Sequence, residues 1–184
     1  MTRRILVWRG LDAWRAEVAH AEIAGDRLEA SGTQIGVEPE PYRLDYELRT
    51  GERFVTVALT VEARGGDWER QLELVRAEDG RWTANGAAVP DVEGALDCDL
   101  GLCPLTNTMP VLRERLLVPG AEPRDLVMAW VSVPDLGVRR SEQRYESIDA
   151  RRVRFVGEQG EFVATLELDE DGFVVRYPEL AERL

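Results

Sequence analysis

The sequence predicts a mainly β protein, in which a curved antiparallel sheet of about ten strands forms a half-barrel or incomplete barrel. Apolar and polar residues alternate along most of the chain, as in Phe54–Ala63, and this period of two is typical of strands. The connections, such as Gly65-Gly66-Asp67, are too short for crossover helices and therefore require antiparallel pairing. A length of 184 residues suits one domain, residues 1–184, with a sizeable core.

The N-terminal half contains the clearest strands. Tyr42–Leu48 places Tyr42, Leu44, Tyr46 and Leu48 on one face, and Phe54–Ala63 alternates throughout. Trp14–Glu22 and Leu28–Gly36 predict a hairpin around Gly25-Asp26, although the Ala, Glu and Arg of the first segment also favour a helix. The meander predicted here continues through Trp68–Val75 and Arg81–Ala84.

The C-terminal half predicts a second meander. Asp125–Val133 is apolar on both faces, which indicates a strand that is buried on both sides. Pro178–Leu184 is expected to form a short helix with Pro178 at its first position. The remaining predicted strands, with the turn Gly157–Gly160 among their connections, are Val138–Ile148, Arg152–Val156, Phe162–Leu168 and Phe173–Tyr177.

The central stretch Asp97–Arg113 differs from both halves because small, polar and turn-forming residues replace the alternation. Within Leu105–Leu117, the helical spacing of apolar residues and Pro110 near the start favour a short helix. A strand that begins at Val111 is the alternative. Because a curved sheet leaves one concave face to cover, we expect one to three short helices to serve as its plug or lid, and this segment is the candidate.

The composition excludes some classes of function. The formal net charge is −12 and the pI is about 4.7, which argues against nucleic-acid binding and against broad adhesion to anionic membranes. The apolar run at residues 5–8 is shorter than the ~7–15 residues of a signal peptide. The longest apolar stretch, Leu126–Val133, is far below the ~20 residues that span a bilayer. We therefore expect a cytoplasmic protein without membrane insertion.

The sequence predicts no catalytic residue, metal or cofactor. His20 is the only histidine, and Cys98 and Cys103 lack the spacing of a zinc pair or redox motif. We expect both cysteines to be buried thiols, with a disulfide on oxidation as a minor alternative. Asp97 and Asp99 are available for acid–base chemistry, but a solvated acidic loop is the stronger interpretation. An enzyme is therefore not the preferred prediction.

The central stretch resembles a known family. Asp99-Leu100-Gly101, followed by Pro104-Leu105-Thr106-Asn107-Thr108-Met109-Pro110-Val111-Leu112-Arg113, is similar to the signature of a bacterial family called putative glycolipid-binding. Met109 and Leu112 stand where that family usually has Leu and Arg. Weaker matches extend over nearly the whole chain, at Trp8-Arg9, Ala129-Trp130-Val131, Gln143-Arg144-Tyr145, and Tyr177-Pro178 with Leu180. The resemblance implies a fold similar to lipoprotein-localisation factors and lipid-carrier lipoproteins, and binding of a lipid or glycolipid.

Together these observations predict non-catalytic binding of an amphipathic small molecule on the concave face. Thr106, Asn107 and Thr108 would hydrogen-bond a sugar or head group, and Arg113 and Arg144 would bind an anionic group. The alternative is that the first three residues cap and satisfy turns and that the arginines form salt bridges within the protein. Trp130, Met128, Phe54, Tyr46 and Phe162 are candidates for the apolar lining, or are ordinary core. The candidate ligand-binding residues are Thr106, Asn107, Thr108, Arg113, Trp130, Met128, Arg144 and Tyr145.

Two further hypotheses belong to other functional classes. One is a hydrolase-like enzyme that acts on such a ligand through Asp99 or Asp97. The other is a protein-interaction module without a ligand, which uses an exposed sheet edge. A homodimer is compatible with each of these hypotheses.

Overall fold

The computed structural model describes residues 1–157 and 160–184 of the protein; residues 158–159, in the predicted turn Gly157–Gly160, lie outside the described residues. Within the described residues, fifteen strands form one sheet in the order β8-β7-β6-β5-β4-β3-β2-β1-β15-β14-β13-β12-β11-β10-β9. The sheet is not closed into a barrel, because its edge strands β8 and β9 are not paired with each other. The prediction of a mainly β, curved antiparallel sheet is confirmed.

The first eight strands form a continuous antiparallel meander. Their inward faces carry the predicted apolar positions: Tyr42, Leu44, Tyr46 and Leu48 of β4 are all buried, because alternate side chains point to the same face. Short 3-10 turns lie at Glu52–Phe54 and Pro90–Val92. The strands are β1 (Thr2–Gly10), β2 (Arg15–Ala24), β3 (Arg27–Gly36), β4 (Tyr42–Thr50), β5 (Thr56–Arg64), β6 (Glu69–Arg76), β7 (Trp82–Ala84) and β8 (Ala87–Ala88).

The remaining strands continue the same sheet from the other side of β1. The last strand of the chain pairs with the first, with Trp8 opposite Arg183 and Gly10 opposite Ala181. All pairs are antiparallel except β9 with β10, which run parallel. These strands are β9 (Asp97–Leu100), β10 (Arg124–Val131), β11 (Val138–Ser147), β12 (Arg152–Gly157), β13 (Phe162–Leu168), β14 (Val174–Tyr177) and β15 (Ala181–Arg183).

Two details differ from the sequence-based prediction. The number of strands exceeds ten, because the N-terminal residues and several two- to four-residue segments also join the sheet. The predicted helix at Pro178–Leu184 is wrong, because residues Ala181–Arg183 form β15. Pairing with β1 and β14 on both sides, together with burial of Ala181, outweighs the local preference of a Pro-initiated turn for helix.

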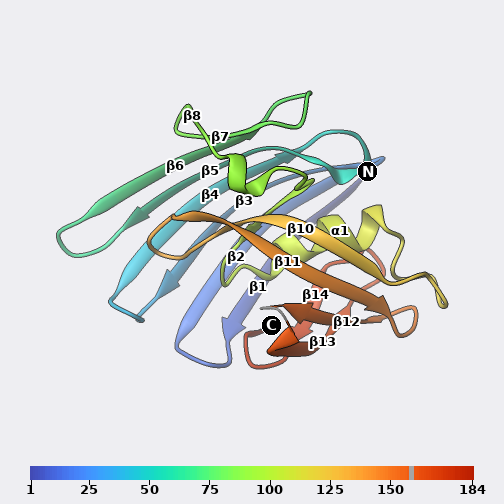
Figure 1. Ribbon diagram of the computed structural model, residues 1–184. Helices are drawn as coiled ribbons and strands as arrows, with labels where there is room; N and C mark the ends of the chain where they lie inside the picture. Colours follow the sequence, from blue (N-terminus) through green and yellow to red (C-terminus); the bar gives the residue numbers. More distant parts are fainter. Residues whose placement is uncertain (158–159) are drawn as a thin grey trace.

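The central stretch forms the predicted plug. A 3-10 turn at Pro104–Asn107 leads directly into α1, Thr108–Arg113, so the helical interpretation is confirmed. Figure 1 shows α1 between the blue-green strands of the first half and the orange strands β10 and β11. Met109 packs in the core beneath β1–β7, whereas Val111 packs in the core beneath β10–β14. The segment therefore fills the concave face and joins the two cores.

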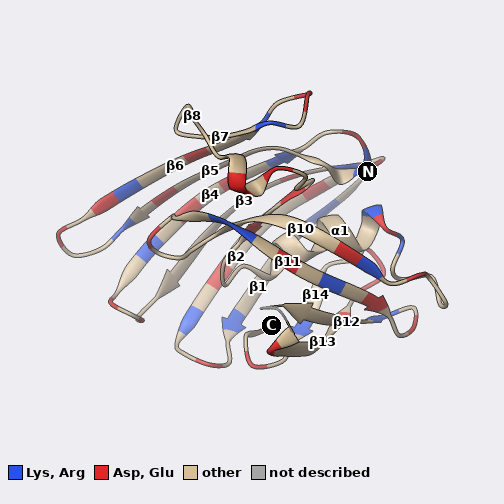
Figure 2. Cartoon of the chain, viewed as in Figure 1, with Lys and Arg blue, Asp and Glu red and all other residues tan. Residues whose placement is uncertain are grey.

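The surface is charged along the strands and turns, with acidic and basic residues mixed (Figure 2). Among the described residues, no helix is long and apolar enough to cross a membrane. The outward faces of β1–β6 are open to solvent, and they carry residues such as His20, Glu47 and Thr60. The candidate site lies instead on the inward side of the sheet, beside the plug.

Candidate functional site

A cavity of about 290 Å³ lies between the loop that follows β9 and strands β10–β14. We call it the aromatic cavity. Its polar wall includes Asp99, Asn107 and Gln143. Its apolar wall consists mainly of rings, those of Trp130, Phe155, Phe162 and Tyr177. The cavity therefore combines an apolar surface with convergent polar groups, as small-molecule sites commonly do.

Asp99 is the acidic group of the polar wall. The amide Nε2 of Gln143 donates a hydrogen bond of 2.6 Å to its Oδ2, and the Thr106 hydroxyl donates one of 3.0 Å to its Oδ1. Burial raises the pKa of Asp99 above its usual range, and these two hydrogen bonds oppose that effect. Each carboxylate oxygen keeps a free lone pair, so Asp99 can accept further hydrogen bonds from a ligand.

Tyr145 contacts two side chains of the polar wall through its hydroxyl group. It is 1% exposed, and its hydroxyl lies 3.0 Å from Asn107 Oδ1 and 3.0 Å from Gln143 Oε1. The Asn107 amide nitrogen faces the carbonyl oxygen of Pro104 at 3.4 Å. The polar wall is thus held by contacts between the plug and strand β11, which are far apart in the sequence.

The apolar wall is built by strands β10 and β12–β14. Phe155 makes edge-to-face contacts with Tyr145, Phe162 and Tyr177, with ring centroids 5.2 to 6.0 Å apart. On β10, the guanidinium of Arg139 from β11 lies over the Trp130 ring at 4.2 Å from its centroid. These rings offer a ligand flat apolar surfaces beside the polar wall.

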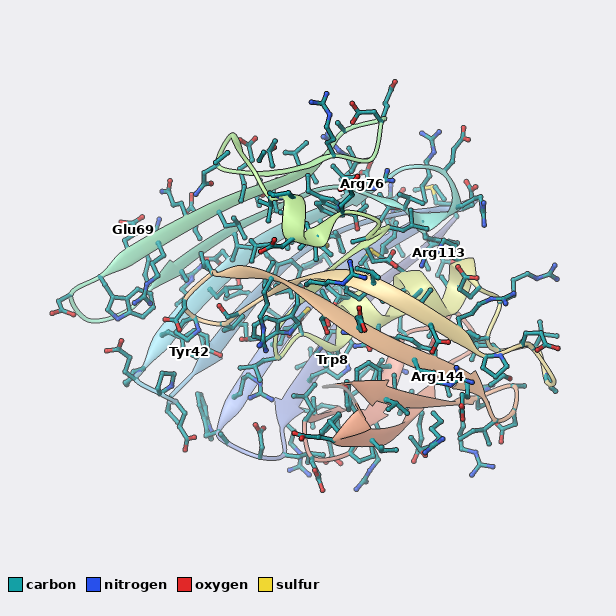
Figure 3. The ribbon with its side chains drawn as sticks, viewed as in Figure 1. Trp8, Tyr42, Glu69, Arg76, Arg113 and Arg144 are labelled. Carbon is teal, nitrogen blue, oxygen red and sulfur yellow. The ribbon has the colours of Figure 1, made fainter. Side chains whose placement is uncertain are left out.

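A buried ion pair joins α1 of the plug to strand β9. Arg113 Nη1 lies 2.5 Å from Asp97 Oδ1, and both side chains are 1% exposed. Glu114 also accepts a hydrogen bond of 2.9 Å from Arg113 Nε. Figure 3 shows Arg113 beside α1 and Arg144 on β11. Arg113 and Asp97 are therefore committed to each other and do not line the aromatic cavity.

The eight predicted ligand-binding residues divide into three groups. Asn107 and Trp130 line the aromatic cavity, and Thr106 and Tyr145 hydrogen-bond to residues that line it. Thr108, Met128 and Arg113 are buried away from it. Arg144 points outward, where it pairs with Asp125 and Glu146.

The apolar candidates divide in the same way. Phe162 lines the aromatic cavity, whereas Tyr46 and Phe54 belong to the core beneath β1–β7. The most important residue that sequence reasoning overlooked is Gln143, which stands within the matched Gln143-Arg144-Tyr145 segment. Alternation would have identified it, since it shares the inward face of β11 with Tyr145, Ser141 and Arg139.

The chain is similar to known proteins in both sequence and fold. A sequence model of a family described as putative glycolipid-binding matches residues 5–183. The chain belongs to this family. A DUF1089 family protein from Pseudomonas aeruginosa, solved at 1.80 Å resolution, is similar to this protein over 96% of this chain and 95% of that one, with 28% sequence identity and a TM-score of 0.78. No curated protein matches the sequence.

A second polar cluster lies beneath β2–β4. Glu17 is 3% exposed, and it accepts hydrogen bonds from the Tyr46 hydroxyl at 2.8 Å and from Gln34 Nε2 at 3.2 Å. The Cys103 thiol donates to the same carboxylate at 3.1 Å. Burial is the largest effect on Glu17 and raises its pKa above 4.5. The Glu17 cluster anchors the loop before the plug to the sheet.

The two cysteines are free and buried, as predicted. Cys103 contacts Glu17, whereas Cys98 lies 3.6 Å from the Thr56 hydroxyl oxygen. Burial raises the pKa of Cys98 to about 12 and that of Cys103 well above its usual range. Neither is a thiolate at neutral pH, so neither is activated as a nucleophile.

Replacing Glu17 by Gln is expected to change the pH dependence of stability. Below about pH 4.5 the Glu17 carboxyl is protonated in both states; above it, the unfolded chain ionises first, because burial raises the pKa of Glu17 in the folded state. Through this window the stability of the wild type should fall, relative to Glu17→Gln, by about 1.4 kcal/mol per pH unit. Urea denaturation between pH 4 and 8 measures this difference. Glu47→Gln, on the exposed face of β4, is the control, and a slope of equal size there would contradict the assignment to burial.

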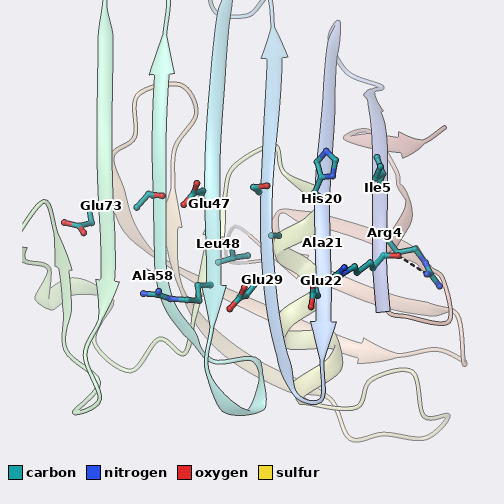
Figure 4. Close-up of a pocket in the computed structure, with 15 residues that line it drawn as sticks. Arg4, Ile5, His20, Ala21, Glu22, Glu29, Glu47, Leu48, Ala58 and Glu73 are labelled. Atoms are coloured by element: carbon teal, nitrogen blue, oxygen red, sulfur yellow. Dashed lines mark hydrogen bonds and ion pairs between the residues drawn. The ribbon is translucent and has the colours of Figure 1, made fainter. Parts of the chain in front are cut away.

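A larger hollow, of about 980 Å³, lies on the outward face of β1–β6 (Figure 4). Its walls include solvent-exposed side chains, among them His20, Glu29 and Glu47, and Ile5 is 68% exposed. Because water reaches these groups freely, the hollow neither desolvates a ligand nor strengthens its polar contacts. The smaller aromatic cavity is therefore the better candidate site.

Proposed function

We propose that this protein binds an amphipathic small molecule, a lipid or glycolipid, in the aromatic cavity and does not transform it. The observation that carries the proposal is the meeting of four aromatic rings with Asp99, Asn107 and Gln143 in one cavity. The family description supports a ligand of the glycolipid type. The proposal places this binding in the cytoplasm, in keeping with the expectation from the sequence.

The size of the cavity limits how much of a ligand enters. Its volume of about 290 Å³ is just below the roughly 300–1,000 Å³ that is usual for small-molecule sites. The interior of the sheet beside it is filled by the plug and by side chains such as Met109 and Leu105, which are 0% exposed. The cavity therefore suits a head group or one short chain, and the rest of a longer amphiphile lies outside it.

The surroundings of the two aspartates favour binding over catalysis. Asp97 is held in the buried ion pair with Arg113. Asp99 is contacted by Gln143 and Thr106, which are neutral groups, and His20 lies on the outward face of β2. A hydrolase needs a nucleophile or an activated water beside a base with a tuned pKa. The polar wall offers hydrogen bonds to a ligand, and its hydroxyl nearest to Asp99, that of Thr106, is also held by the carbonyl oxygen of Cys103.

Native mass spectrometry of the purified protein, followed by solvent extraction, tests the proposal. We expect a co-purifying amphiphile, released on denaturation, in the wild type. Ser141→Phe should lose it, because Ser141 lines the aromatic cavity and a phenyl ring there fills it. Glu142→Phe is the matched control, since the neighbouring side chain is exposed on the opposite face of β11.

Two outcomes would contradict the proposal. One is wild-type protein that carries no amphiphile and takes up none from a lipid extract. The other is equal retention by the wild type and Ser141→Phe with both proteins folded by circular dichroism. Either result would show that the aromatic cavity is not a ligand-binding site.

A further inference from the structure

Two hydroxyl groups of the polar wall, those of Tyr145 and Thr106, each face two acceptors among the described residues. Tyr145 has one hydroxyl proton but lies 3.0 Å from both Asn107 Oδ1 and Gln143 Oε1. The amide nitrogens of these two residues face other acceptors, the Pro104 carbonyl and Asp99 Oδ2, which fixes the orientation of each amide. The Tyr145 hydroxyl therefore donates to only one of the two side-chain carbonyls at any moment.

The same applies to Thr106. Its hydroxyl oxygen lies 3.0 Å from Asp99 Oδ1 and 3.0 Å from the carbonyl oxygen of Cys103, and it has only one proton to donate. When that proton goes to Cys103, Thr106 no longer donates to Asp99 Oδ1. The Tyr145 and Thr106 hydroxyls thus leave acceptor capacity open beside the Asp99 carboxylate.

Asp99 also lacks a counterion. Within residues 1–157 and 160–184, no arginine or histidine forms an ion pair with it, although Asp97, two residues earlier, is paired with Arg113. Arg139 lines the cavity but lies over the Trp130 ring. The Asp99 carboxylate in the cavity wall is therefore available to pair with positive charge that a ligand brings.

We propose that the polar group which occupies this site is a protonated amine, held by Asp99 and the aromatic rings. This inference rests on the proposed function and adds the chemistry of the ligand. An ammonium group brings three donors and no acceptor, whereas each hydroxyl of a neutral sugar adds acceptor capacity along with its proton. The ring faces stabilise a cation. The net charge of −12 favours the approach of cations and disfavours carboxylate or phosphate head groups.

Isothermal titration calorimetry with three octyl compounds tests the inference: octylamine, octyl glucoside and octanoate, each below its micelle-forming concentration. We expect octylamine to bind the wild type about tenfold to a hundredfold more tightly than octyl glucoside, because a hydrogen bond to a charged group is worth that much more. Octanoate should bind most weakly. This ranking needs no variant and therefore does not depend on the folding of one.

Asp99→Asn provides the second arm. We expect it to lose at least about tenfold in affinity for octylamine and to keep its affinity for octyl glucoside within about threefold. Asp125→Asn is the matched control, because it removes the same charge from an exposed position on the adjoining strand, and it should change neither affinity.

The outcomes separate the two proposals. Octyl glucoside or octanoate binding as tightly as octylamine would overturn the inference about the amine and leave the proposed function intact. Equal losses of octylamine affinity in Asp99→Asn and Asp125→Asn would overturn it as well, because the preference would then come from overall charge. Binding of none of the three compounds would overturn both proposals.

Discussion

Arg113→Met is expected to lower the free energy of unfolding by about 3–5 kcal/mol, the usual cost of removing one partner of a buried ion pair. Arg113 and Asp97 side chains are each 1% exposed, so the variant leaves the Asp97 carboxylate without a cation in the interior. Burial already raises the pKa of Asp97, and Arg113 is the main opposing influence. Urea or thermal denaturation followed by circular dichroism measures the change.

A double variant separates the lost partner from the lost packing. Asp97→Leu with Arg113→Met replaces both charges by apolar side chains, and such replacements of buried pairs are often neutral or stabilising. Asp97 Oδ2 and Arg113 Nη2 have no hydrogen-bond partner among the described residues, so the wild-type pair is itself incompletely satisfied. We therefore expect the double variant to be more stable than Arg113→Met alone.

Arg144→Met is the matched control, because Arg144 pairs with Asp125 and Glu146 at the surface. Exposed pairs contribute about 0–1 kcal/mol, so this variant should remain close to the wild type. Equal losses in Arg113→Met and Arg144→Met would contradict the assignment of a structural role to Arg113.

This contrast bears on the meaning of the central sequence pattern. Thr106, Asn107, Thr108 and Arg113 were candidates for direct ligand contact, but the structure gives most of them a partner within the protein. Asn107 lines the aromatic cavity and Thr106 orients Asp99, whereas Arg113 holds the plug against β9. The pattern therefore has two parts: Thr106 and Asn107 contribute to the polar wall, and Arg113 fixes the position of the plug.

The sheet was predictable because strands show a local sequence pattern, the alternation of apolar and polar residues. Alternation marks β4 residue by residue and β5 from Leu59 onward, and the glycine-rich turns place the hairpins. The helical interpretation of Leu105–Leu117 succeeded for the same reason, since apolar spacing and Pro110 act within one turn. The short strands β9 and β15 show little of this pattern; their extended backbone depends on partners far away in the sequence.

The candidate site was less predictable because its contacts are non-local. Arg113 meets a carboxylate 16 positions earlier, and Tyr145 meets Asn107 across 38 positions. A local pattern cannot show whether such an arginine faces an acid or a ligand. Phe155 and Tyr177 enter the aromatic cavity because β12 and β14 curl toward the plug, and this curvature is a property of the whole sheet.

Trp8→Ala is the second substitution with a large expected effect, a loss of about 3–5 kcal/mol in the free energy of unfolding. Trp8 is 1% exposed on β1, and its indole Nε1 donates a hydrogen bond of 2.9 Å to the carbonyl oxygen of Val174 on β14. It thus reaches across β15, a strand of three residues, at the join between the two halves of the sheet. Denaturation monitored by circular dichroism gives the change in midpoint.

Two companion variants show what the indole contributes. Trp8→Phe keeps most of the packing but leaves the Val174 carbonyl without its donor, which should cost about 1–3 kcal/mol. Trp14→Ala, at a tryptophan that is 62% exposed, should stay within about 0.5 kcal/mol of the wild type. A Trp8→Ala variant as stable as Trp14→Ala would contradict the bridging role. Because Tyr177 of the aromatic cavity also stands on β14, loosening this join should weaken ligand retention along with stability.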